Sequence, residues 1–427
     1  MIWIMVGIMV GLLLLGFPLM VPLLSAAIYV MLFELDFIST NRIVAQMVSG
    51  ISSPVLAAVP LFILAADIMT KGRTANRLLD LVMSFFGHLR GGLPVTAAVS
   101  CTLFGAVSGS TQATVVAIGG PLRPKLIKAG YKDSFTTALI INASDIALLI
   151  PPSIGMIVYG VVSRTSVREL FIAGILPGLL ILLFFCVYTY IYSRMKAIPV
   201  EDKTPWGLRL KALRGALLPM GFPVIVVGGI YAGFFSPTEA AAVSVAYAFL
   251  LEVVIFRSLH IKEIWPIALS TGLITAVVFV LVASGQVFSY VISAARIPRE
   301  LIGPLIETLA GNPELALIVI ALAYFIGCMF VDPIVVILVL TPIFTPLVDA
   351  TGLDPVHVGV IVTLQAAIGS ATPPFGCDIF TAIAIFRRPY WDTIKGTPPF
   401  IFILLMSTAV LIAFPQISLF LPQLAFG

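Results

Sequence analysis

The sequence contains few charged residues and few side chains that commonly carry out chemistry. Asp, Glu, Lys and Arg make up 10% of the 427 residues, against about 25% in an average soluble protein. The 4 cysteines are scattered through apolar stretches without a CxxC pair, and the 3 histidines lie far apart. These absences argue against a disulfide framework and against a zinc or other transition-metal site.

Motifs for nucleotide or peptide-bond hydrolysis are also missing. The chain has no Walker A, GxGxxG or HExxH motif. No Ser/His pair and no pair of aspartates can be placed on facing segments with any specificity, so we expect that the protein is not an enzyme. The formal net charge of +4 is spread over short loops between apolar segments, and we therefore expect no nucleic-acid partner.

Apolar residues, in contrast, are abundant. They make up 60% of the chain, and the mean hydropathy is +1.13. Apolar runs of about 20 residues, the length that crosses a hydrocarbon core, recur along the chain without the alternation of a membrane β-barrel. The sequence therefore predicts an all-α polytopic protein in a lipid bilayer. Residues 1–17 lack a basic segment and a cleavage site, which favours a retained membrane segment over a signal peptide.

A weak internal repeat relates the two halves of the chain. A shift of 222 residues superimposes glycines and prolines. The matched pairs are Gly105/Gly327, Pro124/Pro346, Gly130/Gly352, Pro151/Pro373, Pro152/Pro374, Gly174/Gly396 and Pro177/Pro399. Because these residue types determine backbone shape, the agreement predicts two halves with the same order of helices.

The distribution of charge indicates that the halves have opposite orientations in the membrane. Residues 123–132 include four basic residues, whereas residues 345–354 include none and contain two aspartates. We count five spans between these loops, and an odd number places them on opposite sides of the membrane. The sequence therefore predicts an inverted repeat, a recurrent architecture of secondary transporters.

We expect one integral membrane domain over residues 1–427. Ser, Gly and Pro in the middle of two apolar blocks favour helical hairpins that enter and leave the membrane on one side. The expected segments are a first repeat at 43–196 with its hairpin at 43–70, a basic cytoplasmic connector at 197–215, scaffold helices at 216–264, and a second repeat at 265–425 with its hairpin at 265–293.

Polar and helix-breaking residues interrupt the apolar segments at three places in each half. The breaks lie at 52–54, 108–112 and 142–153, and at 270–285, 330–333 and 370–376. Irregular backbone at membrane depth is tolerated where it is buried in protein or lines a wet cavity. Free carbonyls and hydroxyls suit a small alkali cation, and the N-termini of half-helices attract a carboxylate. A single break can be a mere kink, but paired breaks at equivalent positions favour a transport function.

Aspartates within apolar segments are costly and usually functional. Asp332 stands at a break, directly before Pro333, where it could neutralise a cation. Asp145 could do the same, or could simply cap the helix that follows it. Asp67 and Asp378 lie closer to segment ends and are weaker candidates.

Several stretches together resemble one transporter family. They are PLFILAADIMTKG at 60–72, FGAVSGSTQATVVAIG at 104–119, LIPPSIGMIVYG at 149–160, FSPTEAAAV at 235–243, MFVDPIVVILVLTPI at 329–343 and SATPPFG at 370–376. The chain resembles the large membrane subunit of a tripartite ATP-independent periplasmic (TRAP) transporter. The resemblance implies the ion-transporter superfamily fold, with a scaffold and a mobile transport region that moves by an elevator mechanism and contains two re-entrant hairpins and interrupted helices.

The resemblance also implies partners and a location. It implies sodium-coupled import across the bacterial inner membrane of a carboxylate-bearing organic acid, which a periplasmic binding protein delivers. A small membrane subunit of four helices is expected as a separate chain, because this sequence carries no such extra domain.

The breaks and the resemblance together nominate two sets of residues. The resemblance implies one sodium site near the first hairpin tip and residues 108–110, a second near residues 332–333 and 372–373, and a substrate between them. The candidate sodium-binding residues are Ser52, Ser108, Gly109, Ser110, Asp145, Gly327, Asp332, Thr372 and Pro373. The candidate substrate-binding residues are Ser53, Pro54, Asn142, Ser153, Ser370, Phe375 and Gly376.

The substrate class is less clearly indicated than the family. The apolar segments hold no obvious arginine clamp for a dicarboxylate, so hydroxyls and half-helix N–H groups would bind the carboxylate. We expect a sialic acid or a C4-dicarboxylate, with a slight preference for a sialic acid. The alternatives are a stand-alone sodium/divalent-anion symporter and a non-transporting membrane assembly subunit.

Overall fold

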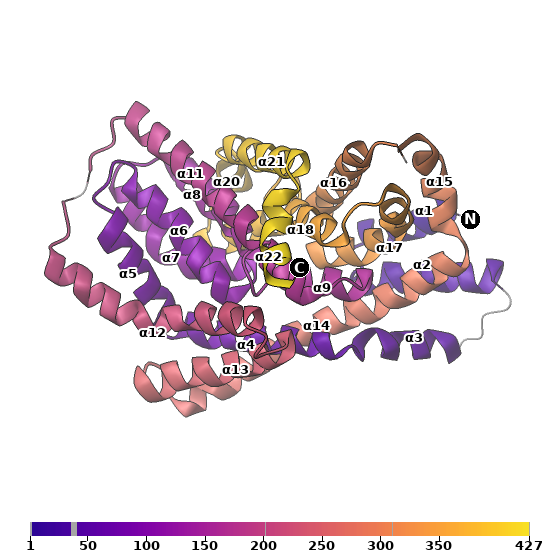
Figure 1. Ribbon diagram of the computed structural model, residues 1–427, viewed down its shortest axis with the longest axis horizontal. Helices are drawn as coiled ribbons and strands as arrows, with labels where there is room; N and C mark the ends of the chain where they lie inside the picture. Colours follow the sequence, from indigo (N-terminus) through magenta and orange to yellow (C-terminus); the bar gives the residue numbers. More distant parts are fainter. Residues whose placement is uncertain (1, 36–40, 201, 310, 427) are drawn as a thin grey trace.

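The computed structural model describes residues 2–35, 41–200, 202–309 and 311–426, and all regular structure in these residues is helical (Figure 1). Seven of the described helical segments are long and apolar enough to cross a membrane, or eight if the bent pair α21–α22 counts as one span. The predicted all-α polytopic membrane fold is therefore confirmed.

The helices of the first half are, in chain order, α1 (Ile2–Leu14), α2 (Met20–Glu34), α3 (Asn41–Ile51), η1 (Pro54–Ala57), α4 (Ala58–Lys71), α5 (Thr74–Phe86), α6 (Gly92–Ser108), α7 (Thr111–Lys128), α8 (Asp133–Ser144), η2 (Asp145–Leu148), α9 (Ile154–Ser163), α10 (Val167–Ala173) and α11 (Ile175–Met195). Those of the second half are α12 (Trp206–Tyr231), α13 (Pro237–Phe249), η3 (Leu250–Ile255), α14 (Ile261–Ala294), α15 (Ile297–Leu309), α16 (Pro313–Phe330), α17 (Pro333–Thr351), α18 (Pro355–Ser370), α19 (Cys377–Phe386), α20 (Tyr390–Ile394), α21 (Pro398–Ala413) and α22 (Gln416–Phe426).

The helix order repeats after 222 residues. Helices α6 to α10 have counterparts in α16 to α20, and corresponding helices begin within a few residues of the predicted offset. Gly130 and Gly352, which the repeat pairs, both end a helix with a positive φ, 99° and 67°. Glycine occupies these positions because other residues rarely adopt this conformation.

Contacts between the halves are reciprocal. Helix α7 packs against α19, and α17 packs against α9. The counterpart of α7 is α17 and that of α9 is α19, so each contact occurs twice with the roles exchanged. A two-fold relation between the halves produces this exchange.

The predicted hairpin at 265–293 is wrong, because these residues lie within the single 34-residue helix α14. Ser284 lies inside this continuous helix, and its hydroxyl donates a hydrogen bond to the backbone carbonyl of Val280, one turn earlier. At Gly285 a side chain is missing because α17 approaches closely: an added Cβ would lie 2.9 Å from Leu338 Cβ. The polar and small residues here therefore serve helix packing.

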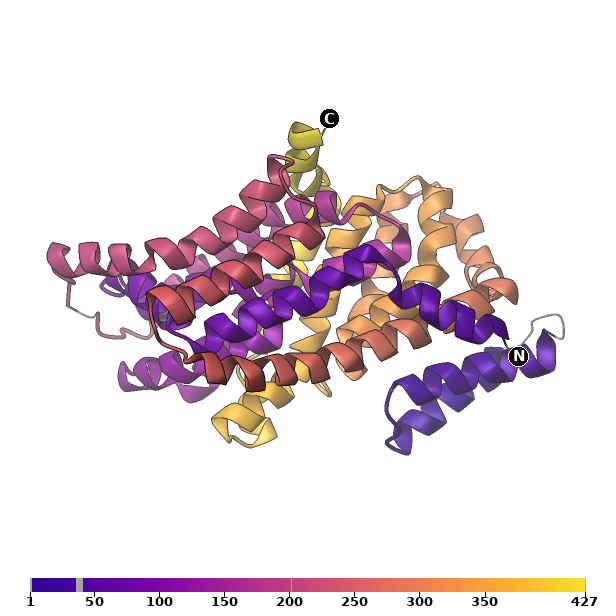
Figure 2. The same ribbon diagram turned by 90° about the horizontal axis from the view of Figure 1, so that it is seen from below.

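The predicted hairpin at 43–70 is also wrong. Helices α3 and α4 follow one another alongside α14, separated by Ser52, Ser53 and the 3-10 turn η1 (Figures 1 and 2). They form an interrupted helix that continues in one general direction. The helical hairpins lie elsewhere: α6 packs against α7 across a two-residue turn, and α16 packs against α17 across another.

The basic connector predicted at 197–215 is partly helical, because α12 begins at Trp206. Arg209, near the start of α12, lies 3.2 Å from His88 Nδ1 and stacks over the ring of Trp206. Helices α12 and α13 then cover α5 and α4.

Candidate functional site

The tips of the two helical hairpins meet at a small cavity of about 70 Å³. The first hairpin contributes residues 109–112 and the second contributes residues 332–334 with Ile337. The remaining lining residues are Leu148, Ile154 and Gly155, beside the break at 149–153, and Thr363 and Ala366 of α18. The cavity, called the central cavity below, thus combines breaks from both halves.

The turn of the first hairpin depends on Gly109. Its φ of 60° is left-handed, and an added Cβ would overlap the carbonyl oxygen of Pro152. The backbone N–H of Ile154 donates to the carbonyl oxygen of Gly109 at 3.3 Å. The hairpin tip is therefore docked against the break in the same half, at a distance that only glycine permits.

Three helices begin at the central cavity. Ser110 caps α7 by accepting a hydrogen bond from Ala113 N, and Ser153 caps α9 by accepting one from Met156 N. Asp332 caps α17, with its carboxylate accepting from Ile334 N at 2.9 Å. Helix N-termini attract negative charge, while the Asp332 carboxylate attracts positive charge. The cavity is therefore suited to a small molecule or ion pair that bears both charges.

The central cavity also has an unused polar atom. Thr363 Oγ1, which belongs to a lining residue from α18, is buried and has no hydrogen-bond partner in the described part of the chain. A hydroxyl oxygen of this kind is a suitable ligand for a sodium ion. The donor set of the cavity thus fits a small alkali cation.

The break at 370–376 is held in shape by hydrogen bonds to the backbone of α18 and α16. Thr372 Oγ1 donates to Ile368 O at 2.6 Å, and Phe375 N donates to Met329 O at 3.1 Å. Gly376 has no room for a Cβ, which would overlap Ser370 O. The Phe375 side chain is 55% exposed, and its ring centroid lies 6.1 Å from that of Phe330. Neither Thr372 nor residues 373–376 line the central cavity.

Asp378 joins the two halves inside the protein. Its carboxylate is 0% exposed and accepts hydrogen bonds from Thr111 Oγ1 at 2.7 Å and from Ser370 Oγ at 2.6 Å. Thr111 also lines the central cavity. The sequence analysis made Asp378 a weaker candidate because it lies closer to the end of an apolar segment. The sequence does contain a signal for Asp378. It lies eight residues after Ser370, across the break that joins the end of α18 to the start of α19.

Asn142 and Asp145 lie behind the cavity, at the junction of α8 and η2. Both are 0% exposed. The two Asp145 carboxylate oxygens and Asn142 Oδ1 have no hydrogen-bond partner among the described residues. Asp145 is therefore not held in place as a helix cap in the described structure.

The structure does not bring residues 52–54 to the central cavity. Ser53 lines a different cavity of about 420 Å³, together with Arg164, Arg168 and Pro237. The hydroxyl of Ser52 donates to Val48 O, and the carbonyl of Pro54 accepts from Thr238 Oγ1. The family resemblance implied that Ser52 lies near residues 108–110, but the interrupted helix α3–α4 positions it elsewhere.

Two other nominated residues belong to the hairpins themselves. Ser108 Oγ lies 3.0 Å from Thr114 Oγ1, across the turn that joins α6 to α7. Gly327 lies one turn before the end of α16, where an added Cβ would be 2.9 Å from Val336 Cγ1 of α17. Gly327 therefore allows the second hairpin to close tightly.

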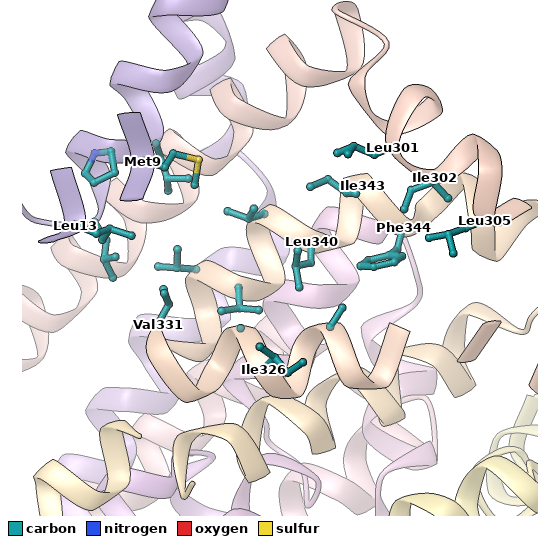
Figure 3. A pocket seen from close by; sticks show the side chains of 18 residues that line it. Met9, Leu13, Leu301, Ile302, Leu305, Ile326, Val331, Leu340, Ile343 and Phe344 are labelled. Carbon is teal, nitrogen blue, oxygen red and sulfur yellow. The ribbon is translucent and has the colours of Figure 1, made fainter. Parts of the chain in front are cut away.

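A larger cavity of about 560 Å³ lies between α1, α2, α15 and the second hairpin (Figure 3). Its lining includes Met9, Leu13, Leu301, Ile326 and Phe344 and is apolar throughout. An apolar wall offers no group that could orient a charged solute. We therefore take the smaller central cavity as the candidate site.

An ion-pair cluster lies outside the spanning helices, where α8 begins. Asp133 accepts hydrogen bonds from Arg123 Nε at 2.8 Å and from Arg388, which follows α19. Burial raises the pKa of Asp133, but the two arginines outweigh this effect and hold the pKa below its usual value. The cluster therefore links the loop after α19 to α7 of the first hairpin through Asp133.

Comparison with known proteins assigns the family. Residues 6–417 match the family model described as "Tripartite ATP-independent periplasmic transporter, DctM component". The chain belongs to this family as a TRAP transporter large subunit. Large subunits of this kind are multi-pass proteins of the inner membrane that work with a small membrane subunit and a periplasmic binding protein, and they are not enzymes. The family predicted from the sequence is thus confirmed.

Three relatives of this TRAP subunit are similar over nearly their whole length. The ectoine TRAP transporter large permease of Halomonas elongata is 63% identical, covering 99% of both chains. The ectoine/5-hydroxyectoine TRAP transporter large permease of Ruegeria pomeroyi is 61% identical, covering 98% of both. A sialic acid TRAP large permease of Vibrio cholerae is 32% identical, covering 98% of this chain and 97% of its own.

A solved structure supports the fold independently. The YdaH transporter of Alcanivorax borkumensis matches with a TM-score of 0.60 at 13% identity, covering 88% of this chain and 87% of its own. At this identity the likeness concerns the fold alone. It agrees with the predicted transporter fold class.

Proposed function

We propose that this TRAP subunit imports ectoine or 5-hydroxyectoine, coupled to sodium ions, by an elevator-type movement. The sequence favoured a sialic acid or a C4-dicarboxylate, but the relatives that share about 60% identity carry ectoine names. Sialic acid is the named substrate of a much less similar relative. The proposed substrate class therefore changes from an acid to a zwitterion.

The observation that carries this proposal is the mixed charge of the central cavity. Ectoine is a cyclic amidinium carboxylate, so it bears both charges at neutral pH. The N-termini of α7 and α9 would bind its carboxylate, and the Asp332 carboxylate, which caps α17, would attract its cationic ring. An all-anionic dicarboxylate would gain less, because Asp332 would repel it.

The small size of the central cavity supports a conformational cycle. Its volume of about 70 Å³ is well below the roughly 300–1,000 Å³ of typical small-molecule pockets. The hairpin tips would have to separate to admit the substrate. We propose that Ser108, Gly109 and Ser110 hold one coupling ion with their hydroxyl and carbonyl oxygens, and that Asp332 lies beside a second near the break at 372–373.

Uptake into proteoliposomes tests this proposal. The vesicles hold the subunit and its small partner, the binding protein is added outside, and a sodium gradient drives the reaction. We expect labelled ectoine to accumulate and unlabelled 5-hydroxyectoine to compete, whereas sialic acid and a C4-dicarboxylate should not compete. Equal rates with potassium in place of sodium would refute the coupling, and uptake without the binding protein would favour the stand-alone symporter.

A further inference from the structure

Two fully buried carboxylates, Asp145 and Asp378, come from different halves of the protein. Each is 0% exposed. Both oxygens of Asp378 accept a hydroxyl hydrogen bond, from Thr111 and Ser370. Both oxygens of Asp145 lack a donor among the described residues. One carboxylate is thus partly compensated by hydrogen bonds, and the other has no such compensation.

The surroundings of Asp145 contain more acceptors than donors. Asn142 Oδ1, one turn earlier, also has no donor among the described residues, while the amide nitrogen of this residue donates to Ala138 O. The hydroxyl of Ser144 is directed back to Ile140 O. Three buried oxygen atoms therefore remain without a hydrogen-bond donor in the described structure. Burying such oxygens is costly unless a positive group compensates them.

Packing brings Asp378 to the same region. Ile141 of α8 and Ala382 of α19 belong to one buried apolar cluster. Asp145 lies one helical turn after Ile141, and Asp378 lies one turn before Ala382. Helices α8 and α19 are in contact with each other, and both pack against α7.

We propose that Asn142, Asp145 and Asp378 bind a sodium ion behind the central cavity, at a site separate from those near residues 108–110 and 332–333. The ligands would be oxygen atoms only, as hard alkali cations prefer. The ion would offset two carboxylates whose burial without a counter-charge is unfavourable. This inference rests on the proposed sodium coupling and adds a site that bridges α8 and α19.

The site also has a direct connection to the substrate. Thr111 donates to Asp378 and lines the central cavity at the beginning of α7. An ion bound by Asp378 would fix the position of Thr111. Occupancy of the ion site would therefore organise one of the helix N-termini that face the substrate.

Sodium titration of thermal unfolding tests the proposal. The purified complex of the large and small subunits is heated in mixtures of sodium and choline chloride at constant ionic strength. Asp145→Asn and Asp378→Asn keep the side-chain shape but remove a charge, and we expect the sodium concentration for half-maximal stabilisation to rise by about tenfold or more. The matched control is Asp67→Asn, since Asp67 is hydrogen-bonded to Thr271 of α14 outside this cluster. The control should titrate as the wild type does.

The other outcomes are also decisive. If both Asn variants titrate as the wild type does, the carboxylates hold protons instead of sodium and the proposal is overturned. If neither variant folds, Thr111→Val and Ser370→Ala retain both carboxylates, and each should weaken sodium binding by roughly tenfold. Unchanged sodium affinity in those two variants would overturn the proposal as well.

Uptake measured on the same preparations separates this inference from the proposed function. Wild-type uptake that is independent of sodium refutes the coupling itself. Sodium-dependent wild-type uptake, together with an unchanged Hill coefficient for sodium in Asp378→Asn, refutes only the additional site. A reduced Hill coefficient in the variant supports both.

Discussion

Replacing Gly109 with alanine should damage the central cavity more than an equivalent glycine replacement elsewhere. Gly109 has a φ of 60°, and an added Cβ would overlap Pro152 O. A left-handed conformation costs a residue with a Cβ about 1–2 kcal/mol. The overlap would also break the hydrogen bond from Ile154 N to Gly109 O, which contributes roughly 0.5–1.5 kcal/mol.

Gly130 supplies a matched control. Its φ of 99° is also left-handed, but an added Cβ would meet nothing within 4 Å. Gly130→Ala therefore carries the backbone cost without the collision. The sum for Gly109→Ala is about 1.5–3.5 kcal/mol against about 1–2 kcal/mol for Gly130→Ala.

Thermal unfolding and ectoine uptake measure the two effects. We expect both variants to lower Tm, with the larger decrease for Gly109→Ala. Uptake should fall strongly only for Gly109→Ala, because the collision displaces Ser110 and Thr111 from the cavity. Equal uptake by the two variants would show that the contact between the hairpin tip and Pro152 does not shape the site.

Three further predictions concern other parts of the protein. Glu252→Gln should lower Tm without changing the substrate affinity of the complex. The buried Glu252 carboxylate accepts hydrogen bonds from the backbone N–H and the hydroxyl of Thr74. Hydrogen bonds to a charged group contribute about 1.5–3 kcal/mol each. Asp133→Asn should lower Tm at pH 7, and its difference in Tm from wild type should shrink as the pH falls below about 4. The reason is that a lowered pKa of Asp133 stabilises the folded protein only while this group is ionised in the unfolded chain. A difference in Tm that stays constant with pH would contradict this. Gly285→Leu should cost about 1–3 kcal/mol through overpacking against Leu338, which denaturation of the purified subunit would detect.

The sequence predicted the repeat because glycine and proline restrict the backbone locally. Gly130 and Gly352 retain their conformation in both halves, and the breaks around Ser110 and Asp332 do begin helices at one cavity. The hairpins were misplaced for a physical reason. Serines and glycines inside an apolar run are compatible with a continuous helix when a neighbouring helix packs on them, as α17 does at Gly285.

The remaining errors depend on tertiary contacts that a single sequence does not contain. Asp378 acquires its importance from Thr111, which is 267 positions away in the chain. Ser53 lies at a genuine break, but the direction of α3 and α4 along α14 removes it from the central cavity. The proposed substrate also had to come from the names of similar proteins, because hydroxyls and helix N-termini can bind many different carboxylates.

The length of α14 has a consequence for how the protein sits in a bilayer. Its 34 residues form a rod of about 51 Å, whereas the hydrocarbon core is about 30 Å thick. A helix of this length either leans steeply or extends well into the headgroup region. Because α14 contacts α2, α3, α4 and α17, any thinning or thickening of the bilayer that changes its slope would be transmitted to the second hairpin. Transport should therefore vary with the acyl-chain length of the lipids used for reconstitution.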